Sequence, residues 1–73
     1  MKELLRSTDS TVIAFATALL SGEDIEWFEL DVNMSLLEGG IGAFPRRLMV
    51  RDADLIAAER VMRDNGIAVS SDG

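Results

Sequence analysis

The chain has 73 residues, which is enough for one domain, and 48% of them are hydrophobic. It contains no cysteine, so neither disulfides nor thiolate metal sites can reinforce the small core. Thirteen acidic against seven basic residues give a net charge of −6, which argues against nucleic acid and anionic membranes as partners.

The first half of the chain predicts a strand, a helix and a second strand. Residues 2–6 form a short opening strand, and Asp9 with its neighbours supplies helix-start chemistry. The helix over 11–21 has an apolar stripe at helical spacing, formed by Val12, Phe15, Ala16 and Leu19 and widened by Ile13 and Leu20. Gly22 is expected to end it in the left-handed conformation. Residues 25–32 then alternate in polarity, as a strand does.

The second half predicts an irregular segment, a strand and another helix. Residues 33–45 contain three glycines and end at Pro45, whereas 46–51 read as a core strand. Asp52 is expected to cap the next helix, which ends at Asn65-Gly66. Its core stripe consists of Leu55, Ala58, Val61 and Met62. We expect a brief edge strand over 67–69 and a flexible tail over 70–73.

The element order is β-α-β-β-α, with a sixth element, a strand, as an alternative ending. This order predicts an α+β sandwich of ferredoxin-like topology, with both helices on one face of a small antiparallel sheet in a single domain over 1–69. Phe28, Leu30, Leu48 and Val50 are the expected core of the sheet, which leaves Trp27 and Met49 on the uncovered face. Trp27, Met49 and Arg51 are therefore interface candidates. Self-association as a homodimer or higher oligomer is one interpretation, and a partly polar monomeric face is the other.

The segment 33–47 is the candidate site, because long connections in small domains are often functional. Its glycines allow backbone amides to approach a ligand, and its two arginines suit a carboxylate or phosphate, although only one of them can face a given site. The candidate ligand- or partner-binding residues are Asn33, Ser35, Gly39, Gly40, Gly42, Arg46 and Arg47. Three interpretations stay open: a purely structural connection, a small anionic ligand such as a metabolite or nucleotide, and a protein partner.

Catalytic chemistry has little support in the residue types present. Histidine, cysteine and tyrosine are absent, and the acidic pairs Glu23-Asp24 and Asp52-Asp54 fall at expected helix ends, where capping explains them. We expect no enzyme activity, no cofactor and no metal. No apolar run approaches the length of a membrane span, and the N-terminus lacks a signal-peptide pattern, so a cytoplasmic location is expected.

Several stretches together resemble a known family. The strand 26–31, the run Asn33-Met34-Ser35 and the segment from Gly39 to Val50 are similar to the small bacterial proteins described as "putative signal-transducing", a family of unknown function. The resemblance extends from Met1 to about Gly66. It implies a fold like that of the nitrogen-regulatory PII proteins, in which residues 33–45 occupy the position of the regulatory loop. It assigns no catalytic or binding role to any residue of this chain.

Overall fold

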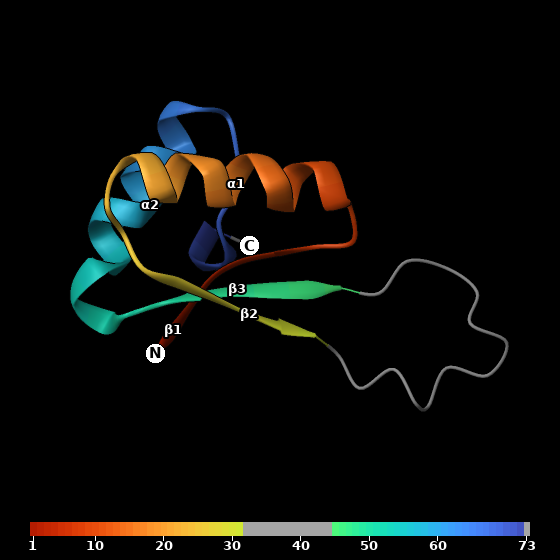
Figure 1. Ribbon diagram of the computed structural model, residues 1–73, viewed down its shortest axis with the longest axis horizontal. Helices are drawn as coiled ribbons and strands as arrows, with labels where there is room; N and C mark the ends of the chain where they lie inside the picture. The colour runs from red at the N-terminus through yellow and green to blue at the C-terminus, as the bar shows by residue number, and fades with distance from the viewer. Residues whose placement is uncertain (32–44, 73) are drawn as a thin grey trace, which may run out of the picture.

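The computed structural model describes residues 1–31 and 45–72 and has an α+β architecture in which a layer of helices lies on a sheet (Figure 1). The strands are β1 (Lys2–Ser7), β2 (Trp27–Asp31) and β3 (Arg46–Val50), the α-helices are α1 (Ser10–Gly22) and α2 (Leu55–Asp64), and two 3-10 helices are η3 (Asp52–Asp54) and η4 (Ser70–Asp72). In these described parts, no helix is both long and apolar enough to cross a membrane.

The three strands form one antiparallel sheet in the order β1-β3-β2. Both α-helices cover the same face of this sheet, and the opposite face has no covering element among the described residues (Figure 1). This arrangement is compatible with a ferredoxin-like fold and confirms the predicted fold class. The sandwich is therefore a two-layer structure with one covered and one open sheet face.

The register between β2 and β3 decides which side chains of β2 are buried. Trp27 lies opposite Val50 and Phe28 lies opposite Met49. Leu48 and Val50 are fully buried beneath the helices, so Trp27, which shares their face, packs against the core. The prediction that Phe28 and Leu30 are core residues and that Trp27 is on the uncovered face was therefore wrong. A change of one residue in register exchanges the two faces of a strand.

An irregularity in β1 allows two adjacent leucines to enter the core. Glu3 pairs with Met49 and Leu5 pairs with Leu48, and the register shifts between them at Leu4. Leu4 and Leu5 are 0% and 1% exposed, so this bulge places consecutive side chains on the covered face. The sequence shows the two adjacent leucines but does not show how a strand accommodates them.

Helix α1 begins at a cap of the expected kind. The Asp9 carboxylate accepts hydrogen bonds from the backbone amide of Thr11 (2.9 Å) and from its hydroxyl (2.6 Å), which lowers the pKa of Asp9. The buried residues of the helix are Ile13, Ala16 and Leu20, with Leu19 packed partly against them. Phe15 was predicted to belong to this stripe, but it is 48% exposed. The buried face is therefore rotated toward Ile13 and Leu20.

Helix α2 buries the predicted side but starts differently. Ala58 and Met62 are fully buried, and Leu55 and Val61 pack against the core. Asp52 does not cap this helix, because η3 comes first and the α-helix begins at Leu55. The Asp52 carboxylate instead contacts the N-terminal ammonium group of Met1 at 2.9 Å, which lowers the pKa of Asp52.

The two α-helices end in the same backbone motif. In α1, the amide of Ile25 donates to the carbonyl of Leu20 (2.9 Å) and the amide of Asp24 donates to that of Ser21 (3.2 Å). In α2, Ile67 and Gly66 make the equivalent bonds to Met62 (2.9 Å) and Arg63 (3.1 Å). This is the Schellman arrangement, with an isoleucine packing on the core after each cap.

The left-handed residue of each motif differs. Gly66, which follows α2, has φ 75°, as the sequence predicted, whereas the left-handed residue that follows α1 is Asp24, with φ 60°. Gly22 was expected to be the left-handed residue that ends α1, but it is the last residue of the helix. Asp24 is thus an L-residue in a conformation that favours glycine.

The expected edge strand over 67–69 does not form, and residues 70–72 of the predicted tail form the 3-10 helix η4. Val69 is buried in the core, and the 3-10 helix η4 lies beside β1, where the fourth strand lies in a complete ferredoxin-like sheet. The Asp72 carboxylate accepts a hydrogen bond from Arg63 (2.8 Å), and the Ser71 hydroxyl donates to Glu59 (2.7 Å). These contacts attach the segment to α2.

Substitutions at the two left-handed residues, Asp24 and Gly66, should change the stability of the domain in opposite directions. Asp24→Gly should raise the free energy of unfolding by about 0.5–1 kcal/mol, because glycine adopts positive φ without the steric cost of a Cβ. Gly66→Ala should lower it by about 1 kcal/mol, although an added Cβ meets no atom within 4 Å. Thermal denaturation should detect both, as shifts of several degrees (about 4–8 °C per kcal/mol). Changes of the same sign in the free energy of unfolding for the two variants would contradict the left-handed conformation of Asp24 and Gly66.

Adjacent residues of β2 should differ sharply in their tolerance of charge. Trp27→Glu places a carboxylate against the core and should destabilise the domain by about 2 kcal/mol or more. Phe28→Glu changes a side chain on the open face and should cost less than about 1 kcal/mol. Urea denaturation of the two variants measures the difference. A similar loss for both would indicate that the open face is covered in solution.

Candidate functional site

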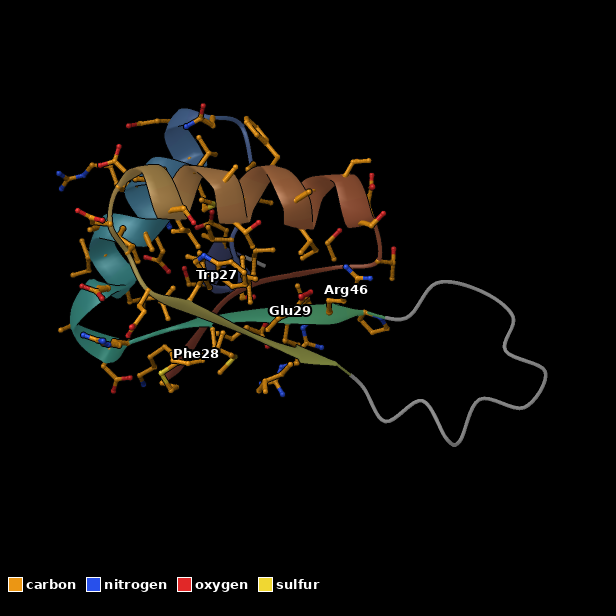
Figure 2. All side chains as sticks on the ribbon, in the orientation of Figure 1. Trp27, Phe28, Glu29 and Arg46 are labelled. Atoms are coloured by element: carbon orange, nitrogen blue, oxygen red, sulfur yellow. The ribbon has the colours of Figure 1, made fainter. Side chains whose placement is uncertain are left out.

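The open face of the sheet carries an apolar patch. Phe28 and Leu30 of β2 are 48% and 46% exposed, and Figure 2 shows Phe28 on the side opposite Trp27 and Glu29. With Met49 of β3 and the N-terminal Met1, they line a shallow groove of about 290 Å³. We call these four residues the open-face patch. Exposed aromatic and aliphatic side chains grouped on one face are a feature of binding surfaces.

A charged cluster lies beside this patch on the same face. The β1–β3 register places Glu3 opposite Met49 and Arg6 opposite Arg47. Glu3 accepts hydrogen bonds from Arg6 Nε (3.1 Å) and Nη2 (2.9 Å), from Arg47 Nε (2.7 Å) and from the Ser70 hydroxyl. The cluster holds two guanidinium groups and one carboxylate, so it is net positive in a chain of net charge −6.

These contacts hold Glu3 in its charged form. The hydrogen bonds from Arg6, Ser70 and Arg47 lower the pKa of Glu3 from its ordinary value of 4.5 to about 2, against an opposing effect of burial. The carboxylate joins β1, β3 and η4 across 67 residues of sequence. Glu3 therefore stabilises the fold while it reduces the positive charge of the cluster.

The two predicted site arginines point to opposite faces. Arg46 lies on the helix side, where it contacts Glu29 at 3.5 Å, and both are labelled there in Figure 2. Arg47 lies on the open face with Glu3. The structure therefore does not bring the two guanidinium groups together. The other predicted ligand-binding residues, Asn33, Ser35, Gly39, Gly40 and Gly42, lie outside the described residues.

The three predicted interface residues are also divided between faces. Met49 belongs to the open-face patch, whereas Trp27 packs toward α1 and its Nε1 donates to the Ser21 hydroxyl at 3.4 Å. Arg51 follows β3 and forms an ion pair with Glu26. Trp27 and Arg51 line a separate polar hollow at the C-terminal end of α1. The sequence therefore identified the open face through Met49 and Arg47 and missed Phe28 and Leu30.

Metal binding has no support in the described ranges, 1–31 and 45–72. No group of three or more acidic side chains is arranged there to hold an ion. The carboxylates of Glu3 and Glu29 instead contact arginines.

Comparison with family models supplies an independent observation. Residues 1–66 match the model of the family described as "putative prokaryotic signal transducing protein". The chain belongs to this family. The match confirms the resemblance found in the sequence and covers the three strands and the two α-helices of the described residues. A search of curated proteins finds no match to the chain.

The family's description concerns signal transduction and names no ligand or reaction. The coarse functional class that this description suggests is a signal-transducing module. Fold and family do not by themselves determine the molecular role, which depends on the surfaces of the domain.

The Glu3 cluster predicts a pH dependence of stability. The pKa of Glu3 is lower in the folded than in the unfolded chain, so its contribution is complete above about pH 5 and is lost as pH falls toward 2. Glu3→Gln should lower the free energy of unfolding by about 2 kcal/mol at pH 7, with a smaller loss near pH 2. Chemical denaturation at several pH values measures this.

Glu26→Gln is the matched control, because it removes a glutamate from an exposed ion pair with Arg51. This variant should change the free energy of unfolding by less than about 0.5 kcal/mol at every pH. Equal pH profiles for the two variants would contradict the role of Glu3.

Proposed function

We propose that the domain is a non-catalytic regulatory module that acts in signal transduction by binding a protein partner. The contact surface is the open face of the sheet, and the segment 33–47, which connects β2 to β3 along the chain, is a second candidate for contact with the partner. The single observation that carries the proposal is the open-face patch, in which Phe28 and Leu30 are about half exposed beside Met49. The family's description as signal transducing agrees with such a role.

The cost of this patch supports the proposal. A domain of 73 residues has little apolar surface available for its core. Burial of a phenylalanine or leucine side chain is worth about 1.5–3 kcal/mol, so leaving both half exposed reduces the stability of a small fold. A partner that covers the patch recovers this free energy on binding.

A small anionic ligand has less support as the bound species. Arg46 and Arg47 lie on different faces, and each contacts a glutamate. A small anion therefore cannot be held by both of these guanidinium groups at once. No contact among the described residues favours this alternative. A thermal-shift titration with nucleotides and organic acids separates it from partner binding.

Site-specific photocrosslinking tests the proposal. A benzophenone amino acid at position 28 should give a discrete crosslinked protein product in cells that produce the domain. Position 15 is the matched control, because Phe15 is also 48% exposed but lies on α1. The proposal predicts a product at position 28 that is absent at position 15. Identical products at both positions, or none at position 28, would refute it.

A further inference from the structure

We infer that the partner segment is an amphipathic helix with an apolar stripe and acidic residues along one side of that stripe. This inference rests on the proposed function and specifies the chemistry of the bound partner. Three properties of the open face carry it: its size, its geometry and the distribution of its charges.

The size of the face favours one helix over a second copy of the chain. Three strands about 4.8 Å apart and about 17 Å long present a projected area on the order of 250 Å². A stable homodimer buries roughly 800 Å² on each partner. A single helix, which is about 10 Å wide and rises about 1.5 Å per residue, matches the face with about three turns.

The geometry of the face favours a helix over an extended peptide. Extended peptides add to the edge of a sheet, where backbone groups are free, whereas the exposed apolar groups here are side chains on the flat face. Phe28 and Leu30 are two residues apart on one strand, about 7 Å along it. That distance is close to the spacing of helix residues four apart, which is about 6 Å.

The charges on the face specify the polar side of the helix. Phe28 and Leu30 occupy the β2 margin, whereas Arg6 and Arg47 occupy the β1 and β3 side, with guanidinium-bearing side chains 59% and 40% exposed. Glu3 neutralises one of these two charges and is itself only 15% exposed. A helix with glutamate or aspartate beside its apolar stripe complements this pattern. A second copy has no unengaged acidic group on this face among the described residues, and it repeats the net charge of −6.

Selection from a display library tests the inference without a known partner. Random 16-residue peptides are selected on the wild-type domain and counter-selected on Phe28→Glu. We expect enriched sequences with apolar residues at i, i+3, i+4 and i+7 and an excess of Asp and Glu. Synthetic copies should become helical on binding, and should bind Phe28→Glu at least tenfold more weakly than Phe15→Glu.

The variant Arg47→Gln tests whether the open face recognises acidic residues of the peptide. Arg47→Gln should weaken binding of the selected acidic peptide several-fold, and replacing the peptide's acidic residues by glutamine should abolish that difference. The thermal stability of Arg47→Gln is measured in parallel, because Arg47 also contacts Glu3. Peptides that lack a helical period, that are enriched in Lys and Arg, or that bind Phe28→Glu unchanged would overturn the inference, as would no enrichment at all.

Two further outcomes would identify a different occupant and also overturn the inference. One is a stable dimer of the wild-type domain in sedimentation equilibrium that Phe28→Glu dissociates. The other is saturable binding to vesicles of phosphatidylglycerol and phosphatidylcholine that the same variant abolishes. The crosslinking at position 28 distinguishes the proposed function from the inferred partner. A crosslinked product there, together with selected peptides that are non-acidic or non-helical, would support the proposed function and refute only the acidic helix as the partner segment.

Discussion

The structure depends on the register of β2 against the central strand β3 beneath a single layer of helices. Leu48 and Val50 are fully buried on the covered face, so every β2 residue opposite them is directed to the same side. Trp27 therefore completes the core, and Phe28 and Leu30 must face solvent. The open-face patch is a direct consequence of this register, because no other described element covers that side of the sheet.

The charged cluster connects the stability of the fold with the properties of its surface. Glu3 joins β1, β3 and the C-terminal 3-10 helix through hydrogen bonds from Arg6, Arg47 and Ser70. The same contacts fix two guanidinium groups beside the apolar patch. A residue that holds the sheet margin together thus also sets the electrostatic character of the face on which we propose that a partner binds. An acidic protein with a locally cationic, apolar face is suited to selective recognition.

Much of the architecture was predictable from local signals in the sequence. The helix start at Asp9, the end of α2 at Gly66 and the burial of Leu48 and Val50 all follow from capping chemistry and polarity patterns. These signals depend on residues within a few positions of one another. The candidate site was predicted less well, because only Met49 and Arg47 of the open face were recognised. Arg46 and Arg47 were correctly expected to point to different faces.

The sequence by itself determined the element order, the fold class and the family, since these depend on local periodicity and on motifs along the chain. Only the tertiary structure decided which side of β2 is buried. Residues 27–30 read Trp-Phe-Glu-Leu, and apolar residues occur on both sides of the strand, so alternation favours the side of Phe28 and Leu30. The register with β3 and the β1 bulge, which are set by contacts between distant residues, select the other side. The location of the proposed binding surface follows from those non-local contacts.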